Sequence, residues 1–311
     1  MKRNILLTII VTLLLTSCAS EQRKSNTISL SGAFALYPMA VKWTEEYQKL
    51  HPEIRFNVSG GGAGKGMADA LAQTVDLGMF SREISSEEIK QGVWWVGVCV
   101  DAVIPTISRQ NPFIDSIKLH GITREKLRQT FITGSISSWN QLISLRENAN
   151  IALYTRSDAC GAAETWAHYL GRKQENLLGV GIYGDPGLAE AVMKDKFGLG
   201  FNNTAYAYDI KTNKKRPGIE VIPLDLNGND IIDQDENFYE NLDELLQAIS
   251  KGVYPSPPAR ELYFVSKGQP RKQKVIDFLR WIITDGQQYV KEAGYVPLAE
   301  EELKANLTKF K

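Results

Sequence analysis

The sequence predicts an α/β protein of two domains, each built on a mainly parallel β-sheet that is flanked by helices. Three observations support this fold class. The 311 residues suit two domains of ordinary size, hydrophobic residues make up 43% of the chain, and short apolar runs alternate with helical periodicity from residue 27 onward. The 36 basic and 36 acidic residues balance, which argues against a nucleic-acid partner because such proteins carry a basic surface.

In the first part of the chain, strands and helices alternate as they do in parallel sheets. We expect strands over residues 27–30, 54–58, 75–79 and 93–107, and helices over residues 37–50 and 67–73. Another helix should start after Ser85, because Ser85 and Glu88 have the spacing of a capping box. Residues 60–66 are rich in glycine, which predicts a turn between a strand and a helix.

A second unit begins near residue 108 and repeats the alternation. The predicted strands cover residues 151–155, 198–201, 220–224 and 262–265. One helix is predicted to start at residue 123, and three others are predicted over residues 161–170, 237–250 and 272–284. The two units therefore have the same α/β character.

The N-terminus has the features of an export signal. Lys2 and Arg3 precede an apolar run over residues 5–15, which is too short to span a bilayer core of about 30 Å. The run ends in Leu-Thr-Ser-Cys18, which resembles the lipobox of bacterial lipoproteins. We expect a signal peptide over residues 1–17, a lipid anchor on Cys18 and a polar tether over residues 18–26. An ordinary signal peptide that contains a cysteine is the alternative.

Four segments place backbone amides where a strand ends. They are residues 31–34, 60–66, 78–82 and 156–161. Amides at such positions, together with the dipole of a following helix, favour the binding of an anion. The glycine-rich segment is not a nucleotide P-loop, because Lys65 is followed by Gly66 rather than by Ser or Thr. A flexible strand–helix connection is the alternative interpretation of this segment.

Several motifs resemble the substrate-binding proteins of phosphate-type ABC transporters. The matching segments are Ser31-Gly-Ala, Thr74-Val-Asp-Leu-Gly78, residues 122–127, Ser138-Trp-Asn140, Arg156-Ser-Asp158 and residues 286–298. The resemblance implies a two-lobed periplasmic-binding-protein fold of type II, often called a Venus flytrap. It also implies that lobe 1 consists of residues 27–102 plus 260–311, and that residues 103–259 form lobe 2.

The same resemblance implies a binding function rather than catalysis. We expect a monomer in the cell envelope, lipid-anchored to a bacterial membrane and facing the periplasm or the exterior, that captures phosphate or a similar oxyanion and delivers it to an ABC permease. No catalytic cofactor is expected. The leaflet that carries the anchor stays open.

The residues implied for the ligand site fall in the four amide-rich segments. They are Ala33, Phe34, Ala35, Gly61, Gly62, Gly64, Ser81, Arg82, Arg156, Asp158, Cys160, Gly161 and Ala162. Several depart from the familiar members. Leu36 stands where those have a threonine, Gly62 replaces a serine, and Ser81 replaces a carboxylate. Ser31, Ser59 and Ser157 could supply other hydroxyl groups.

Only the Arg156 and Asp158 pair matches without change, since Cys160 and Ala162 replace hydroxyl residues of the family motif. An arginine fork suits an oxyanion, and a neighbouring aspartate can hold the fork in place. The identity of the oxyanion therefore stays open.

A second motif has the ligand spacing of a calcium loop. Its candidate ligands are Asp225, Asn227, Asn229, the carbonyl of Ile231, Asp233 and Glu236. The sixth position, usually glycine, is Asp230, which tolerates left-handed geometry better than most residues. The motif predicts a structural Ca²⁺ site, and a solvated acidic loop is the alternative.

Two other function classes stay open from the sequence. One is an anion-sensing signalling lipoprotein, and the other is a secreted phosphatase-like hydrolase that uses Cys160 or Ser157. His168 lies eight residues from Cys160, about 12 Å along a helix, which is too far for a nucleophile and its base. Whether Cys99 and Cys160 form a disulfide is also open.

Overall fold

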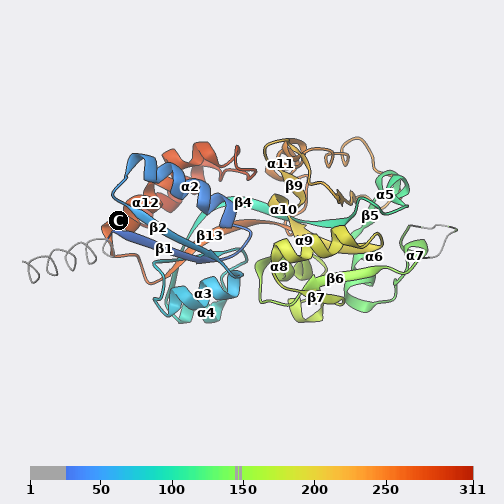
Figure 1. Cartoon of the computed structure of the whole chain (residues 1–311), viewed down its shortest axis with the longest axis horizontal. Helices are drawn as coiled ribbons and strands as arrows, with labels where there is room; N and C mark the ends of the chain where they lie inside the picture. The colour runs from blue at the N-terminus through green and yellow to red at the C-terminus, as the bar shows by residue number, and fades with distance from the viewer. Residues whose placement is uncertain (1–25, 144–145, 147–148, 311) are drawn as a thin grey trace, which may run out of the picture.

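The computed structural model describes residues 26–143, 146 and 149–310. The signal peptide, Cys18 and all of the tether except residue 26 lie outside the described residues. Figure 1 shows two bodies side by side, joined by two long strands. None of the helices in the described ranges is both long and apolar enough to cross a membrane.

Lobe 1 contains both the first and the last elements of the described chain. Its strands are β1 (Thr27–Gly32), β2 (Arg55–Gly60), β3 (Leu77–Phe80) and β13 (Ala259–Lys267). Its helices are α2 (Tyr37–Leu50), α3 (Ala63–Leu71), α4 (Ser86–Lys90), α12 (Gln273–Ile282) and α13 (Glu300–Thr308), with a 3₁₀ turn at Asp285–Tyr289. The C-terminal segment therefore completes the lobe that the N-terminal segment begins (Figure 1).

Lobe 2 is formed by the middle of the chain. Its strands are β5 (Ile122–Thr123), β6 (Ala152–Arg156), β7 (Val180–Ile182), β8 (Gly198–Asn203), β9 (Tyr208–Asp209), β10 (Lys214–Lys215), β11 (Ile219–Val221) and β12 (Leu224–Asp225). Its helices are α5 (Ile114–His120), α6 (Arg124–Arg128), α7 (Trp139–Ile143), α8 (Gly161–Tyr169), α9 (Gly184–Lys194), α10 (Thr204–Ala207) and α11 (Leu242–Ser250). A π-helical turn at Gln129–Thr133 extends α6, and a 3₁₀ turn covers Gln174–Asn176.

One strand, β4 (Val93–Ser108), belongs to both lobes. Its first part pairs with β13 as far as Ala102, and its second part pairs with β8 from Val103 onward. The large sheet therefore has the order β2-β1-β3-β13-β4-β8-β6-β7, with β11 also on β4. The chain crosses between the lobes in β4 and again where it enters β13 at Ala259, so a movement of one lobe relative to the other requires bending at these two crossings.

The sheet is mixed, which refines the expected parallel arrangement. Strands β2, β1 and β3 are parallel to one another, and so are β8, β6 and β7. Strand β13 runs antiparallel to β3 and β4, and β4 runs antiparallel to β8. The shared strands enter each sheet from the other lobe, so they carry no helical crossover of their own and need not be parallel.

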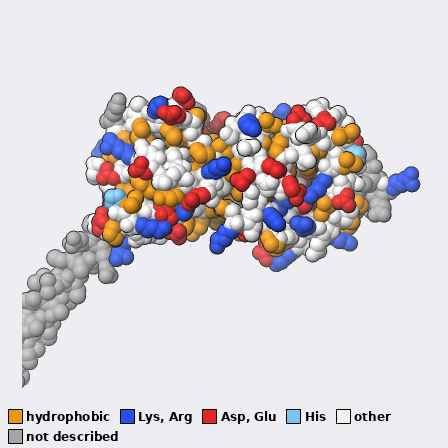
Figure 2. Space-filling model, turned by 90° about the horizontal axis from the view of Figure 1, so that it is seen from above, with side chains coloured by type: hydrophobic (Ala, Val, Ile, Leu, Met, Phe, Trp, Pro, Cys, Tyr) orange, Lys and Arg blue, Asp and Glu red, His pale blue; other side chains and the backbone are white. Residues whose placement is uncertain are grey.

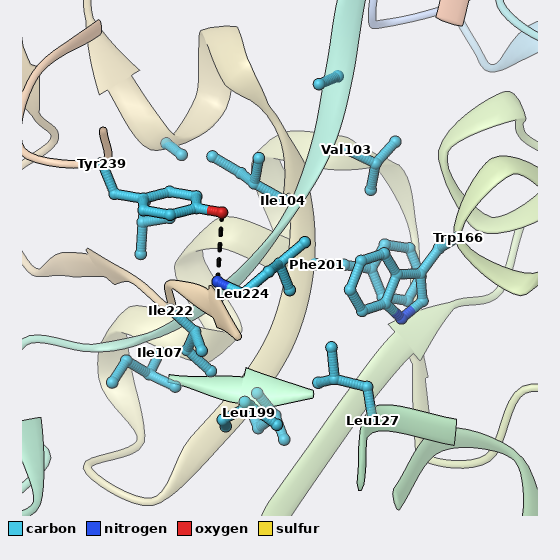
Figure 3. Close-up of a cluster of buried hydrophobic side chains, with 14 of the residues drawn as sticks. Val103, Ile104, Ile107, Leu127, Trp166, Leu199, Phe201, Ile222, Leu224 and Tyr239 are labelled. Carbon is cyan, nitrogen blue, oxygen red and sulfur yellow. Dashed lines mark hydrogen bonds between the residues drawn. The ribbon is translucent and has the colours of Figure 1, made fainter. Parts of the chain in front are cut away.

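Each lobe has its own hydrophobic core. Trp43, Phe264 and Phe278 are buried in lobe 1, and Trp139, Trp166 and Phe201 are buried in lobe 2. In Figure 3, Trp166 lies beside Phe201, and their ring centroids are 5.7 Å apart. The same view shows the Leu224 amide donating to the Tyr239 hydroxyl at 3.2 Å. Burial of each such side chain stabilises the fold by about 1.5–3 kcal/mol.

Local structure agrees with the sequence at some points and corrects it at others. The predicted helix over residues 37–50 is confirmed, and Ser85 and Glu88 form the expected capping box at α4. The glycine-rich turn is shorter than expected, because α3 already begins at Ala63. Gly66 is therefore a helix residue, and a Cβ atom there would lie 2.4 Å from the Met79 carbonyl oxygen. The small residue allows α3 to pack directly on β3.

Candidate functional site

Arg156 ends strand β6 and borders the cleft between the lobes. Its side chain has no exposed surface. Asp158 accepts from Nε at 2.8 Å and from Nη2 at 2.6 Å, and Asp185 accepts from Nη1 at 2.6 Å. A guanidinium group has five N–H donors. Each terminal nitrogen of Arg156 therefore keeps one N–H beyond these three bonds.

The acidic partners of Arg156 continue into a buried polar chain. Asn203 donates to Asp185 at 2.6 Å and accepts from Arg260. Arg260 also donates to Thr165 at 3.1 Å and forms an ion pair with Asp101 at 2.9 Å. Since Arg260 pairs with Asp101 where β13 meets β4, the chain links Arg156 to the strands that join the lobes.

Burial and neighbouring charge set the protonation of this group. Burial alone would lower the pKa of Arg156, but the charges of Asp185 and Asp158 raise it above its ordinary value. Burial raises the pKa of Asp185, and the nearby charge of Arg156 only partly opposes this increase. Arg156 therefore stays positively charged, while Asp185 takes up a proton more readily than an exposed aspartate does.

The glycine-rich segment of lobe 1 lies directly on lobe 2. Gly64 donates its amide to the carbonyl of Ala159 at 3.2 Å. Gly62 has a φ of +88°, and a Cβ atom there would lie 2.9 Å from Oδ2 of Asp158. Its own amide donates to Gly32 at 3.1 Å. Glycine is thus required where the two lobes touch, and the amides of Gly62 and Gly64 are already bonded within the protein.

The start of α8 provides a second contact between the lobes. A Cβ atom on Gly161 would lie 2.1 Å from the carbonyl oxygen of Ser81 in lobe 1. Gly161 and Ala162 are the first two residues of α8, so their amides have no carbonyl partner within the helix. Cys160 caps the helix by accepting from the Ala163 amide at 3.4 Å. Two backbone donors of lobe 2 therefore lie at the junction.

The first loop of lobe 1 presents an aromatic ring to Arg156. The centroid of the Phe34 ring lies 5.9 Å from Cζ of Arg156 and 6.3 Å from the centroid of the Tyr183 ring. Tyr206 of lobe 2 donates to the Phe34 carbonyl at 3.2 Å. Because the guanidinium group has no exposed surface, an anion could reach it only after the lobes separate.

Other expected ligand residues of lobe 1 are occupied elsewhere. Ala33 and Ala35 are buried in the core, and the Ala33 amide donates to Met79 at 2.9 Å. Both terminal nitrogens of Arg82 bond to Glu88, at 3.0 and 2.7 Å. A Cβ atom on Gly61 would meet the side chain of Lys65. Arg82 borders the cleft, but its fork is held by Glu88.

Two of the candidate serine hydroxyls also bond within lobe 1. Ser31 donates to Asp69 at 2.7 Å, and Ser59 donates to the Leu30 carbonyl at 3.5 Å. They are directed to partners in their own lobe. Ser157 remains the candidate that borders the cleft, where it follows Arg156 directly.

The cleft has a volume of about 1220 Å³ and carries charges of both signs. Its charged lining includes Arg82, Arg172, Lys173, Glu83, Glu164 and Glu175. On the face seen in Figure 2, basic and acidic side chains are likewise interspersed over both lobes. The charge around Arg156 is therefore local, and it is not part of a wide basic surface.

A family model described as the PBP superfamily domain matches residues 18–286. The chain belongs to this superfamily. Two relatives are phosphate-binding proteins named PstS. One, from Xylella fastidiosa, is 25% identical and the match covers 91% of this chain and 84% of the relative. The other, from Methanocaldococcus jannaschii, is 26% identical, and the match covers 93% of this chain and 87% of the relative.

Solved structures confirm the fold of this PBP superfamily chain. A substrate-binding protein of a phosphate ABC transporter from Clostridium perfringens, solved with bound phosphate, superposes with a TM-score of 0.72. The match covers 88% of this chain and all of that one, at 18% identity. The predicted two-lobed α/β fold is thus confirmed.

The predicted calcium loop of this PBP superfamily chain is closed by its own hydrogen bonds. Asp225 accepts from the amides of Gly228 and Asp230 at 2.6 and 3.0 Å. Glu236 accepts from Leu226 at 2.9 Å, and both carboxylates are buried. Asp230 has a φ of +64°, the left-handed geometry expected at the sixth position.

The other expected ligands meet at the middle of the same loop. Asn227 and Asn229 both donate to Asp233, at 2.9 and 2.8 Å, and Ile231 is exposed. Within the described ranges, no group of three His, Cys, Asp or Glu side chains is arranged to hold a metal ion. Calcium binding therefore stays a prediction.

The two cysteines in the described part of the chain are separate free thiols. Cys99 is buried in lobe 1 and Cys160 in lobe 2, and neither forms a disulfide. Burial raises the pKa of Cys160 to about 12, so its thiol stays protonated at neutral pH.

The sequence did not reveal four polar residues that act on Arg156 directly or through partners. They are Asp185, Asn203, Arg260 and Thr165. Gly184-Asp185-Pro186 has the composition of a helix start, but it carries no signal for a partner 29 residues away.

Proposed function

We propose that this chain is the substrate-binding component of an ABC importer and captures inorganic phosphate or a closely related oxyanion. The observation that carries the proposal is Arg156, a buried guanidinium group with a free N–H on each terminal nitrogen, at the junction of two lobes. A planar fork of this kind binds two oxygens of one anion. The amides of Gly161 and Ala162 would add backbone donors at a helix N-terminus.

The names of the relatives support the same ligand. Two relatives of similar length are called phosphate-binding proteins, and a chain with the same fold was solved with phosphate. The replaced residues leave the choice among phosphate, arsenate and sulfate to the remaining groups. We infer that Arg156 supplies most of the affinity for whichever of these binds.

The hydrolase alternative has little chemical support. A cysteine nucleophile acts as the thiolate, whereas burial raises the pKa of Cys160 to about 12. Its sulfur also accepts from the Ala163 amide, which is the role of a helix cap. An anion sensor would use the same site and would differ only in its protein partner.

Equilibrium titration with phosphate, arsenate and sulfate tests the ligand. Arg156→Ala should weaken binding by about thirtyfold to several-thousandfold, because truncation of a buried charge partner costs about 2–5 kcal/mol. Arg156→Lys should not restore binding, since a point charge does not reproduce the fork. Arg82→Ala is the matched control and should change the dissociation constant by less than about threefold, because exposed or already paired charges contribute little.

Two results would contradict the ligand proposal. Wild-type protein that binds none of the three anions would do so, and so would an Arg156→Ala variant that binds as tightly as wild type. Either result would mean that the cleft takes a different class of ligand.

We also propose that Cys18 carries a lipid anchor that keeps the protein at the membrane near its permease. Acyl chains contribute about 0.8 kcal/mol per buried CH₂ group, so more than one chain anchors stably. Cys18→Ala should move the protein from the membrane fraction to the soluble fraction without changing its melting temperature. Wild-type protein that fractionates as soluble and carries no acyl chain would contradict the anchor.

A further inference from the structure

One arginine in this fold is paired with two buried carboxylates. Asp158 bonds to Nε and Nη2 of Arg156, and Asp185 bonds to Nη1. The exposed fraction of the side chain is 9% for Asp158, 3% for Asp185 and 0% for Arg156. When all three are ionised, the group has one excess negative charge. An incoming anion would add to this charge in a region that water screens poorly.

The groups that face Asp185 do not remove the excess charge. They are Arg156 at the end of β6, Asp158 after it, Cys160 before α8, Tyr206 in α10 and Arg260 in β13. Cys160 and Tyr206 stay neutral at physiological pH, because burial raises both pKa values. Arg260 is already matched by Asp101. The excess charge must therefore be relieved when an anion binds.

We propose that Asp185 sets the pH dependence of the anion site, because it binds one proton from solvent when the anion enters. This inference rests on the proposed function. It makes affinity depend on pH through the protein itself, in addition to any titration of the ligand.

The proton has a defined place and consequence. Oδ1 of Asp185 accepts from Asn203, and Oδ2 accepts from Nη1 of Arg156. A proton on Oδ2 forms one O–H bond, which can donate to the anion, and it leaves Oδ2 a weaker acceptor than a carboxylate oxygen. The Nη1 hydrogen bond to Asp185 is then weaker, and this N–H can turn to the anion. The anion itself is chemically unchanged, and the proton comes from water or buffer.

The burial of Asp185 makes this proton uptake attainable. Its pKa is raised by burial, with Arg156 acting in the opposite direction. An additional negative charge nearby raises a carboxyl pKa further. Binding of the anion and binding of the proton therefore favour each other.

Calorimetric titration with inorganic phosphate in two buffers of different ionisation enthalpy measures the proton directly. At about pH 8 and above, where phosphate is mainly the dianion, wild-type protein should take up close to one proton per anion. Its dissociation constant should then rise by up to about tenfold per pH unit. Asp185→Asn should bind phosphate more tightly than wild type at this pH, with little proton uptake and a flatter pH profile.

Two results would overturn the inference. Wild-type protein could bind phosphate without proton uptake, or Asp185→Asn could keep the uptake of wild type. If Asp185→Asn keeps the uptake and also binds more weakly, Asp185 only holds Arg156 in place. If wild-type protein binds no phosphate, the proposed function fails, and this inference fails with it.

A second variant protects the test against misfolding. The double variant Asp185→Asn with Asn203→Asp keeps one carboxylate and one amide in the same hydrogen bond. It moves the negative charge from Arg156 towards Arg260. We expect it to fold and to bind phosphate without the proton uptake of wild type. Uptake equal to that of wild type would overturn the inference.

Discussion

The two lobes bring different kinds of chemical groups to the cleft. Where lobe 1 touches lobe 2 near Arg156, it contributes the backbone of Gly62, Gly64 and the Ser81 carbonyl, together with the Phe34 ring. Lobe 2 contributes the charged side chains of Arg156, Asp158 and Asp185. The contact between the lobes therefore sets a close-packed backbone surface against a buried ionic group.

This difference separates two requirements of binding. The charged groups of lobe 2 hold one another in place, so Arg156 is oriented before any anion arrives, which lowers the entropic cost of binding. The glycines at the junction determine how closely the lobes approach. Substitutions in lobe 2 should therefore change the charge chemistry, and substitutions at the contact should change closure.

Apart from the Arg156 variants, the largest effect is expected at the contact itself. Gly161→Ala places a methyl group 2.1 Å from the Ser81 carbonyl, which neither backbone can accommodate in the closed form. We expect about a hundredfold weaker anion binding, or about 2.7 kcal/mol, within the usual cost of overpacking. Gly187→Ala in α9 is the control, since a Cβ atom there would approach only a side-chain atom, Cγ2 of Ile182, at 3.1 Å. Equal affinities for both variants would contradict the role of the contact.

The predicted calcium loop lies in lobe 2, so bound Ca²⁺ should stabilise that lobe and not lobe 1. Bound Ca²⁺ at ten times its dissociation constant should stabilise lobe 2 by about 1.4 kcal/mol. Chelation should therefore lower the melting temperature by several degrees, and Glu236→Gln should remove this sensitivity because the twelfth position gives two ligand oxygens. Asp235→Asn, at a position of the loop that is not an expected ligand, should retain it. A melting curve indifferent to calcium and chelator would exclude the site.

The corresponding test in lobe 1 uses pH. Burial would raise the pKa of Glu88, but Arg82 and the Ser85 amide lower it below its ordinary value. Ionised Glu88 therefore stabilises the fold above an unfolded pKa of about 4.3, and this stability is lost as pH falls through the folded pKa. Glu88→Gln should reduce the free energy of unfolding by about 1 kcal/mol at neutral pH.

Denaturant unfolding at several pH values measures this effect. The difference between Glu88→Gln and wild type should disappear in acid, where both side chains are uncharged. Glu45→Gln, at an exposed position of α2, is the control and should show little difference at any pH. A Glu88→Gln deficit that persists unchanged in acid would mean that charge has no part in the effect.

The smallest effect is expected at the cap of α8. Cys160 accepts from the Ala163 amide, and a serine oxygen is a stronger acceptor in that position. Cys160→Ser should raise the free energy of unfolding by about 0.5 kcal/mol. It should also strengthen phosphate binding slightly, because the hydroxyl returns a donor beside Gly161. Ala162→Thr tests, two residues later, whether an added hydroxyl strengthens phosphate binding. Weaker binding by both variants would contradict the prediction that these hydroxyls act as donors to the anion.

Sequence patterns predicted local structure well where the signal lay within a few residues. The helix at residues 37–50 and the capping box of Ser85 and Glu88 depend on neighbours three or four residues apart. The sequence predicted a turn over residues 60–66, but residues 63–66 belong to helix α3. Glycine disfavours a helix, but close packing of Gly66 on Met79 overrides that preference.

The sequence by itself determined the α/β alternation, the family and the local pair of Arg156 and Asp158, which lie two residues apart. Only the tertiary structure decided that Asp185, 29 residues from Arg156, is the second carboxylate on the same guanidinium group. It also decided that Arg260 reaches Asn203 across 57 residues. Hydrophobic periodicity records which face of a strand or helix is buried. It does not record which buried polar groups meet, because that depends on how strands from distant segments are ordered in the sheet.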